Sequence, residues 1–347
     1  MSYFQENIDK LAGYAPGFQP GSADVVKLNT NENPYSPSPK VLEAVAGITA
    51  EQLRRYPQPL GDDFRVAAAK LHGLELENII CVNGGDDLLT ICLRAFCGPG
   101  TAVAYPLLTY SLYPVLADLQ NCEAIEVPYG GGWALPIEEL AAAKAGLTIV
   151  CNPNAPSGTF TEPKQLAELA GKLAGKGVLL IDEAYVDFAK DNCIALVKEF
   201  DNVIILRSMS KGYSLAGLRF GYGIGPKELI AGLMKVKDSY NVDAISIAAA
   251  TAAIKDQKYF LENAEKVKSE RERLTIAMRE MGFAVPDSDT NFILAQYDDG
   301  AEQLYNELVQ MEIFVRYFKI EGLRDKLRIT VGTKEQNDKL IAALKKR

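Results

Sequence analysis

Short apolar runs rich in β-branched residues alternate with helical patterns from about residue 75 to residue 225. This alternation favours an α/β domain in which right-handed crossovers place helices on both faces of a largely parallel sheet. Ligands of such sheets bind beyond the carboxyl ends of the strands. The predicted strands are residues 79–81, 102–105, 124–127, 148–151, 178–181, 203–206 and 220–224, and the predicted helices include residues 86–96, 136–143 and 163–173.

The pattern changes after residue 240. Residues 244–280 are almost continuously helical, whereas the first 35 residues contain the prolines, glycines and asparagines of an irregular arm. We therefore predict a large domain over residues 30–243 and a smaller α+β domain that combines residues 1–29 with residues 244–347. The small domain should contain strands near residues 291–295, 314–317 and 327–331 and a final helix over residues 335–344.

Composition argues against several classes of function. The net charge is −8 without a basic stripe, so nucleic acid is not an expected partner. Because no apolar run approaches the roughly 20 residues that span a bilayer and the N-terminus does not resemble a secretory signal, we expect a cytoplasmic protein away from membranes. The six cysteines lack metal-ligand spacing, so we expect free thiols and no metal.

The single histidine, His72, narrows the chemistry further. It ends a helical pattern before a glycine, where a packed side chain or a helix-end cation is the usual role. A Ser-His-Asp triad and a poly-histidine metal site are therefore poorly supported. Acid–base chemistry would have to use lysine, tyrosine, carboxylates or a cofactor.

Lys211 lies just past the predicted strand 203–206, among serines and glycines and close in sequence to Arg219. A partly dehydrated lysine near a second cation has a lowered pKa and can act as an amine nucleophile. Hydroxyls, glycine N–H groups and an arginine are also what a bound phosphate needs. These features point to a Schiff-base lysine for pyridoxal phosphate. A surface lysine in a Ser/Gly loop is the alternative that this segment alone leaves open.

Asp182 directly follows the predicted strand 178–181. A carboxylate there could bind a metal, act as a base or pair with a protonated ring nitrogen, and the segment offers too few oxygen ligands for a metal. Opposite a pyridine nitrogen it would keep that atom protonated, and Tyr185 could then contact the phenolic oxygen of the cofactor. A carboxylate that caps the following helix is the alternative.

Two further segments follow predicted strands. The loop 152–158 holds two prolines, two asparagines and a glycine, so it is either a plain turn or a pocket wall. Gly84 and Gly85 lead into the predicted helix 86–96, where exposed N–H groups favour an anion. Asp86 and Asp87 suit the first turn of that helix equally well without any ligand.

Together these segments resemble a known family from one end of the chain nearly to the other. The resemblance is to class II pyridoxal-phosphate-dependent aminotransferases of the aspartate-aminotransferase fold (fold type I), and within them to the histidinol-phosphate aminotransferase family. The fold would have a large domain with a mostly parallel seven-stranded sheet and a smaller α+β domain. The motifs that carry it are residues 28–34, 55–57, 83–87, 109–113, 152–158, 182–185, 210–211, 216–219 and 327–333.

The resemblance implies roles around the cofactor. Lys211 would hold it as an internal aldimine and move the substrate proton, Asp182 would face the ring nitrogen, and Tyr185 would face the ring oxygen. Tyr110 would stack on the ring. The cofactor phosphate would be held by Gly85, Asp86, Ser208, Ser210 and Arg219, and by Tyr56 of a neighbouring subunit, which implies a homodimer with shared sites.

The resemblance also implies a substrate pocket and a reaction. Arg328 would bind the amino-acid carboxylate and Arg316 the substrate phosphate, while Tyr14 and Asn33 would belong to an arm that closes over the substrate. The implied reaction is reversible amino transfer between L-histidinol phosphate and 2-oxoglutarate in histidine biosynthesis. The alternatives are an aromatic or broad-specificity aminotransferase, a threonine-phosphate decarboxylase on the same scaffold, and a non-catalytic cofactor-binding protein.

One position departs from the family pattern. The family loop usually has Asn-Pro-Asn-Asn-Pro-Thr-Gly, and its second central asparagine bonds the ring oxygen of the cofactor. This chain has Ala155 at that position and Ser157 in place of the threonine. Loss of one neutral hydrogen bond costs on the order of 1 kcal/mol when another group replaces it. Asn154 and Asn152 are the neighbouring amides that could reach the oxygen instead.

Overall fold

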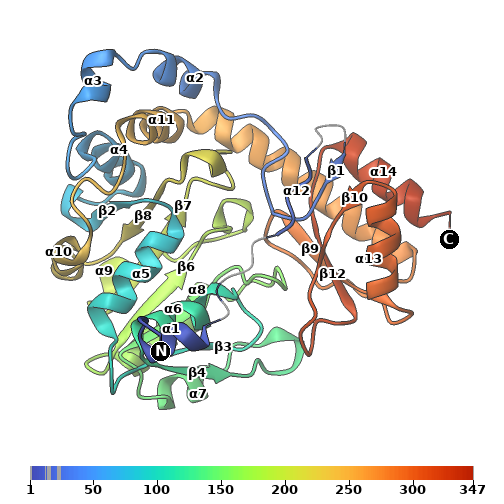
Figure 1. Ribbon diagram of the computed structural model, residues 1–347, viewed down its shortest axis with the longest axis horizontal. Coiled ribbons are helices and arrows are strands. Elements are labelled where there is room, and N and C mark those ends of the chain that lie inside the picture. Colours follow the sequence, from blue (N-terminus) through green and yellow to red (C-terminus); the bar gives the residue numbers. More distant parts are fainter. Residues whose placement is uncertain (1, 12, 14–16, 22–24, 347) are drawn as a thin grey trace.

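The structure is a computed structural model that describes residues 2–11, 13, 17–21 and 25–346 of the chain. Figure 1 shows a large lobe and a smaller lobe side by side, with the C-terminus on the small lobe. Among the described residues, no helix combines the length and the apolar character that crossing a membrane requires.

The large lobe is built around a seven-stranded sheet, as predicted. Six strands run in one direction, and β8 alone runs antiparallel to its two neighbours, β2 and β7. The strand order is β2 (Ile79–Val82), β8 (Gly221–Ile224), β7 (Val203–Ser208), β6 (Val178–Asp182), β5 (Leu147–Cys151), β3 (Ala102–Pro106) and β4 (Glu123–Val127).

Helices cover both faces of this sheet because successive side chains of a strand point to opposite faces. In β7, for example, Val203 and Ile205 join one apolar core and Ile204 and Leu206 join the other. One face carries α5 (Gly85–Phe96), α6 (Leu112–Gln120) and α10 (Lys227–Val236). The other carries α2 (Pro39–Ala46), α4 (Asp62–His72), α7 (Ile137–Ala142), α8 (Pro163–Leu173), α9 (Leu196–Glu199) and α11 (Ala244–Lys255).

The small lobe has its own apolar core. Its antiparallel sheet has the order β11 (Arg316–Tyr317), β12 (Lys326–Thr330) and β9 (Phe292–Gln296). The strand β1 (Val26–Lys27) pairs in parallel with β10 (Ile313–Phe314), which ties the N-terminal segment to this lobe. The helices α13 (Ala301–Gln310) and α14 (Lys334–Leu344) complete it.

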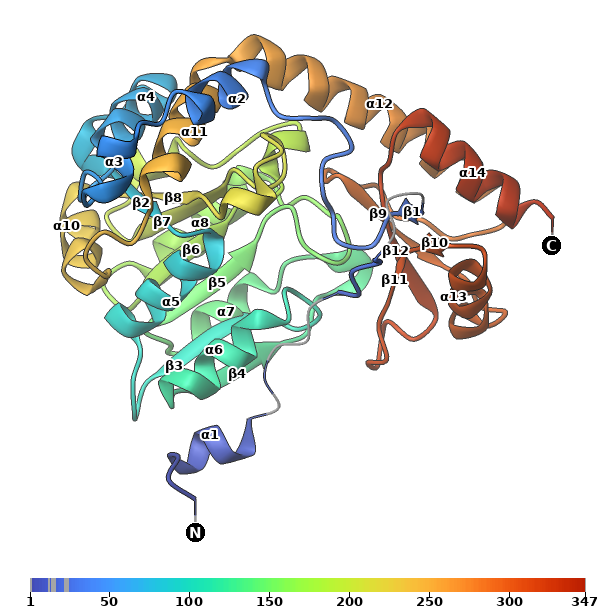
Figure 2. The ribbon, with the colours of Figure 1, turned by 45° about the horizontal axis from the view of Figure 1, so that its top comes forward.

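The packing differs from the predicted domain boundary at residue 243. The helix α11 was expected in the small domain, but it packs against α2 and α4 of the large lobe. The next helix, α12 (Gln257–Glu280), runs from the large lobe to the small lobe in Figure 2. Leu274 and Met278 near its end belong to the small-lobe core, so the lobes divide along α12.

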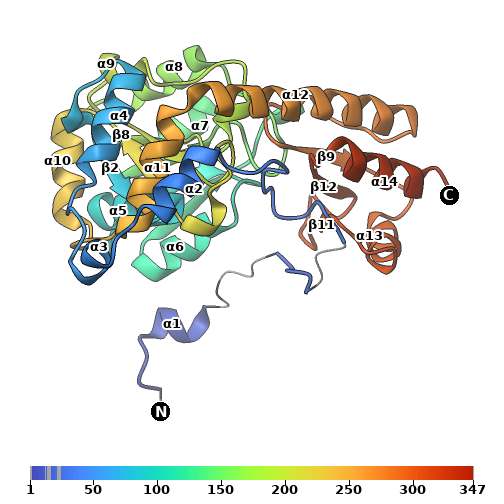
Figure 3. The same ribbon diagram turned by 90° about the horizontal axis from the view of Figure 1, so that it is seen from above.

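The first part of the chain is not wholly irregular. The helix α1 (Glu6–Lys10) lies outside both lobes in Figure 3, and the Asn7 amide donates a hydrogen bond to the Asp118 carbonyl on α6 at 2.8 Å. The remaining short elements are α3 (Ala50–Arg54) and the 3-10 turns η1 (Leu76–Asn78), η2 (Gly131–Trp133), η3 (Val186–Phe188) and η4 (Ala216–Leu218).

Candidate active site

A cavity of about 170 Å³ lies where β6 and β7 end, beside the first turn of α5 and against β12 of the small lobe. Most of the predicted cofactor residues meet there. Its lining includes Gly85, Asp86, Tyr110, Asp182, Tyr185, Ser208, Ser210, Lys211, Arg219 and Arg328.

Lys211 projects into this cavity from the loop after β7. Its Nζ donates a hydrogen bond to the Thr30 carbonyl at 3.3 Å and lies 5.6 Å from the centre of the Tyr185 ring. Burial, followed by the positive charge of Arg328 and then of Arg219, lowers the pKa of this amine to about 8. The lowered pKa increases the fraction of neutral amine near neutral pH, which is the form that reacts as a nucleophile.

Asp182, the last residue of β6, is buried at the base of the cavity. One carboxylate oxygen accepts a hydrogen bond from the Tyr113 hydroxyl at 2.7 Å, and the other accepts the Ala184 N–H at 3.1 Å. Burial raises the pKa of this carboxyl group to about 6, although both hydrogen bonds oppose the shift. A positively charged ligand atom at this carboxylate would lower the pKa again and favour the ionised form.

The Tyr185 hydroxyl faces the same cavity. Its oxygen accepts a hydrogen bond from the Asn31 amide at 3.0 Å, and its ring packs edge-on against Phe292 with centroids 5.1 Å apart. Burial raises the pKa of this hydroxyl to about 12, so it stays protonated and can donate a hydrogen bond.

The first turn of α5 and the Lys211 loop form a cradle for an anion. The leading N–H groups of a helix have no partner within the helix, so those of Gly85 and Asp86 are available to a ligand. Arg219 donates to the Ser210 hydroxyl at 3.3 Å and pairs with Asp86 at 3.4 Å. Gly84 has φ +85°, and a Cβ there would lie 2.7 Å from the Arg219 guanidinium, so glycine keeps the cradle open.

Tyr110 forms a side wall of the cavity. Its hydroxyl donates to an Asp86 carboxylate oxygen at 3.2 Å, and its ring meets Tyr113 nearly at a right angle with centroids 5.6 Å apart. These contacts hold an aromatic ring at the edge of the cavity, where a second flat ring can pack against it.

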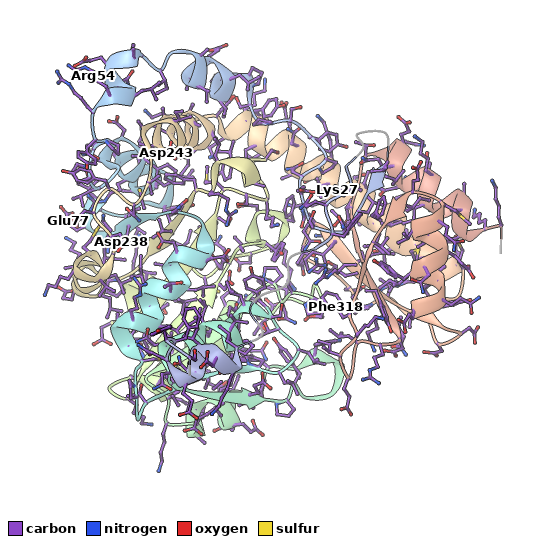
Figure 4. All side chains as sticks on the ribbon, viewed as in Figure 1. Lys27, Arg54, Glu77, Asp238, Asp243 and Phe318 are labelled. Atoms are coloured by element: carbon purple, nitrogen blue, oxygen red, sulfur yellow. The ribbon has the colours of Figure 1, made fainter. Side chains whose placement is uncertain are left out.

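A second cavity of about 90 Å³ adjoins the first and shares Thr30, Tyr110 and Arg328 with it. It also contains Arg316 and Phe318 of the small lobe, and Ala155 of the large-lobe loop. Figure 4 shows Phe318 on the side of the small lobe that faces the large lobe. Two guanidinium groups in one small space are suited to a ligand with two anionic groups.

Asn154 and Asn33, two of the predicted contact residues, are occupied elsewhere in the structure. Asn154 accepts from the Thr109 hydroxyl at 2.8 Å and donates to the Ser157 hydroxyl at 2.9 Å, and it does not line the cavity. Asn33 donates to the Lys211 carbonyl at 3.0 Å, so it holds the lysine backbone. Neither residue lines either of the two cavities.

Asn152 and Tyr56 do not line the cavity either. The Asn152 side chain bonds the backbone of Thr161. Tyr56 is 81% exposed and stacks on Tyr240 with centroids 4.5 Å apart. Tyr14 falls outside the described residues.

The structure adds three residues that sequence reasoning did not assign. They are Thr30 and Asn31, which line the cavity, and Tyr113, which bonds Asp182. Asn31 lies inside the family motif 28–34, so the motif was a usable signal. Tyr113, on α6, lies inside the family motif 109–113, but no local pattern connects its hydroxyl with the carboxylate on β6.

The residues present fit pyridoxal phosphate. A buried carboxylate at the base suits the ring nitrogen, a hydroxyl suits the ring oxygen, and Tyr110 suits the ring face. The N-terminus of α5, the serines and Arg219 suit the phosphate. Lys211 supplies the amine that attaches the aldehyde.

Comparison with known proteins agrees with this site. The family model for class I and II aminotransferases matches residues 23–344. A Trichormus variabilis protein named histidinol-phosphate aminotransferase 1 is 49% identical over 346 residues, covering 99% of this chain and 98% of that protein. A histidinol-phosphate aminotransferase of Citrifermentans bemidjiense is 42% identical over 348 residues, covering 99% and 98%.

A solved structure gives the same picture. The histidinol-phosphate aminotransferase of Sinorhizobium meliloti, in complex with pyridoxal-5'-phosphate, superposes with a TM-score of 0.89 at 27% identity, covering 100% of this chain and 97% of that one. The fold, the lysine at the end of β7 and the sequence similarity over almost the whole chain therefore agree. The chain belongs to the class I and II aminotransferases.

Proposed function

We propose that this aminotransferase binds pyridoxal phosphate on Lys211 and transfers an amino group between L-histidinol phosphate and 2-oxoglutarate. The observation that carries the proposal is the pair of adjoining cavities. One holds a buried amine, a buried carboxylate and an anion cradle, and the other holds Arg316. Arg328 lies between them and lines both.

The two arginines match the charges of both proposed substrates. Arg328 donates to the Asn29 carbonyl at 3.1 Å and lies over the rings of Phe292 and Phe318, at 5.2 Å and 5.5 Å, which fixes its orientation. It would take the carboxylate of glutamate next to the reacting carbon. Arg316 lies over the Phe318 ring at 5.4 Å and would take a phosphate or the distal carboxylate. The local positive charge contrasts with a chain whose net charge is −8.

Lys211 is suited to hold the cofactor and to move the proton. With its pKa lowered to about 8, on the order of a tenth of the amine is neutral at pH 7. Bound pyridoxal phosphate supplies an electron sink for the bonds at the substrate's reacting carbon. From its place in the cavity lining, the Lys211 amine would take a proton from one carbon of the bound substrate and return it to another.

Asp182 and Tyr185 would both help to orient the cofactor ring. The Asp182 carboxylate is fixed by Tyr113 and by the Ala184 N–H, so it presents one negative charge to a ring nitrogen. The Tyr185 hydroxyl, held by Asn31, presents a donor to a ring oxygen. Both groups are bound to other elements before any ligand arrives, which reduces the cost of ordering them.

Tyr56 supports the proposal of a homodimer with shared sites. It lies 81% exposed on the large lobe, close in the chain to Leu53, which is 61% exposed. Apolar and aromatic side chains gathered on one surface are typical of subunit interfaces. We propose that Tyr56 contacts the cofactor phosphate in the partner's cavity.

Mixing two inactive variants would test the shared site. Tyr56→Ala and Lys211→Ala chains, refolded together, should form hybrids with one intact cavity and recover part of the wild-type activity. If the activity of the mixture is no higher than that of the two variants measured separately, the shared site is contradicted. Analytical ultracentrifugation of each variant controls for loss of the dimer itself.

The reaction is tested by a screen of amino donors with purified protein and 2-oxoglutarate. Histidinol phosphate should give the largest kcat/KM. A preference of tenfold or more for phenylalanine or tyrosine would favour an aromatic aminotransferase, and release of carbon dioxide without 2-oxoglutarate would favour the decarboxylase. The names of the curated relatives favour neither alternative.

Substitution of the lysine tests the attachment. Lys211→Ala should lower kcat by about 10³-fold or more, because it removes both the attachment point and the proton carrier. Borohydride should no longer fix the cofactor to the chain, whereas the melting temperature should remain near that of the wild type. Lys237→Ala, at a lysine that lines neither cavity, is the matched control and should keep trapping and turnover.

A further inference from the structure

Asn31 connects the N-terminal segment to the Tyr185 hydroxyl. It is 1% exposed, lines the cofactor cavity, and adopts a left-handed backbone with φ 56°. Its Nδ2 donates to the Tyr185 oxygen at 3.0 Å. Asparagine tolerates this backbone better than most residues, so the position places an amide at the hydroxyl without a large conformational cost.

Thr330 fixes which end of the Asn31 amide faces Tyr185. The Thr330 hydroxyl accepts the Asn31 backbone N–H at 3.0 Å and therefore has its own hydrogen to give. It gives this hydrogen to Asn31 Oδ1 at 3.0 Å. With its oxygen engaged by this donor, the Asn31 amide presents its NH₂ end to Tyr185.

A second small-lobe residue also holds Asn31; we call the contacts of Asn31 with Thr330 and Asn291 the Asn31 clamp. The Asn291 amide donates to the Asn31 carbonyl at 2.9 Å, and both asparagines are buried. Thr330 lies two residues after Arg328 on β12, so the strand that presents the substrate arginine also fixes Asn31. The clamp thus joins the small lobe to a hydroxyl of the large lobe.

The Asn31 contact changes what Tyr185 can donate. A hydroxyl that accepts a hydrogen bond becomes a stronger donor through its own hydrogen. In the cavity this effect opposes burial, since the Arg328 charge and the Asn31 hydrogen bond both lower the pKa of Tyr185 while burial raises it. Because the Asn31 amide occupies an acceptor position of the Tyr185 oxygen, the hydroxyl hydrogen points away from Asn31.

We propose that Asn31 is a positioning residue, which strengthens and orients the Tyr185 hydroxyl toward the cofactor's ring oxygen and so compensates for the amide that Ala155 lacks. The inference rests on the proposed function, since it requires bound pyridoxal phosphate. Ala155 cannot donate, and the structure engages Asn154 and Asn152 elsewhere. Asn31 is the amide that donates to the Tyr185 hydroxyl, which itself would contact the ring oxygen.

The test is a pH titration of the visible absorbance of the bound cofactor. When the bound cofactor loses a proton at high pH, its ring oxygen carries a negative charge that the Tyr185 hydroxyl stabilises. A weaker donor at Tyr185 therefore raises the pH at the midpoint of this absorbance change. Asn31→Gly keeps the left-handed backbone and removes the amide. Its midpoint should rise by roughly half a pH unit to one unit. An unchanged midpoint would overturn the proposal.

A double-mutant cycle separates positioning from direct contact. Tyr185→Phe should raise the midpoint by more than Asn31→Gly does, and adding Asn31→Gly to Tyr185→Phe should then have little further effect. Equal shifts by Asn31→Gly in both backgrounds would show that Asn31 acts without Tyr185, and the proposal would fail.

Substitutions at Thr330 test the proposal independently, so it can still be contradicted if the Asn31→Gly variant does not fold. Thr330→Val removes the hydroxyl at constant shape and should raise the midpoint, whereas Thr330→Ser keeps the hydroxyl and should not. Shifts in both or in neither would overturn the proposal. Failure of the proposed function is distinct, because wild-type protein would then show no cofactor absorbance to titrate.

Discussion

The two walls of the active-site cavity are built in different ways. In the large lobe, Asp182 and Lys211 follow neighbouring parallel strands, and the anion cradle is the first turn of one helix. In the small lobe, Arg316 and Arg328 pair across a short antiparallel sheet, and Asn31 is held by Thr330, 299 residues away. The large-lobe wall depends on local backbone geometry, whereas the small-lobe wall depends on contacts between distant segments.

This difference assigns separate tasks to the walls. The large-lobe wall should govern how tightly the cofactor is held. The small-lobe wall should govern which substrate is accepted. Substitutions in one wall should therefore change one property and spare the other.

Replacement of Arg328 should give the largest separation. Arg328→Lys keeps the charge but loses the planar fork that binds a carboxylate with two hydrogen bonds. We expect kcat/KM for glutamate to fall about 100-fold, while the cofactor dissociation constant changes little. Arg324→Lys, at an exposed arginine nearby, is the matched control. A parallel loss of cofactor affinity would contradict the division between the walls.

Substitution of Gly84 should give the opposite pattern. In Gly84→Ala the new Cβ would lie 2.7 Å from the Arg219 guanidinium and the backbone would keep φ +85°, so the cradle must shift. We expect the cofactor dissociation constant to rise about tenfold, with kcat at saturating cofactor nearly unchanged. Gly232→Ala on α10, where a Cβ would meet nothing within 4 Å, should leave cofactor binding intact.

Acid should weaken the large lobe through His72, the only histidine of the chain. Burial and then the Arg207 charge lower its pKa from 6.5 to about 3. Below pH 6.5 the unfolded chain therefore binds a proton that the folded chain does not, and stability falls with pH. Urea unfolding followed by the fluorescence of Trp133 should show His72 costing about 2 kcal/mol at pH 5.

His72→Gln should flatten this dependence between pH 7 and pH 5. His72 contacts the Tyr222 hydroxyl at 3.0 Å, and glutamine can keep a hydrogen bond there without titrating. An equally steep loss of stability in the variant would show that groups other than His72 cause the acid sensitivity. Asp182 and Asp187 cannot be those groups, because burial raises their pKa values to about 6 and they therefore stabilise the fold as the pH falls.

Asn154 should give the smallest effect. Because its amide joins Ser157 and the Leu108 carbonyl, Asn154→Ala should lower the free energy of unfolding by about 1 to 2 kcal/mol. The absorbance midpoint of the bound cofactor should not move. A shifted midpoint would indicate that Asn154 contacts the ring oxygen of the cofactor, as the sequence suggested.

The sequence predicted most of the large lobe because its signals are local. All seven strands of the sheet coincide with the predicted runs to within a few residues. The same alternation placed Asp182 and Lys211 at strand ends. The domain division stays a prediction; the structure packs α11 against α2 and α4 of the large lobe, and helix periodicity indicates that a segment is helical but not which lobe it packs against.

The remaining site residues depend on distant partners. Tyr113 is connected with Asp182 only by the fold, and the Asn31 amide meets Tyr185 across the lobes. Asn154 lies in a loop whose spacing fits the cavity, but its side chain points to Thr109 instead. A single sequence carries no signal for the direction of a side chain in such a loop.

The parallel pairing of β1 with β10 has a consequence for the order of events during synthesis. Val26 emerges from the ribosome early, but its partner Ile313 is made only when most of the chain has been translated. The large lobe can assemble around its own sheet in the meantime, because domains generally fold as units during synthesis. The segment that carries Asn31 must wait, so the substrate side of the cavity is completed last, and a nascent chain stalled before β10 would carry the lysine without its closing wall.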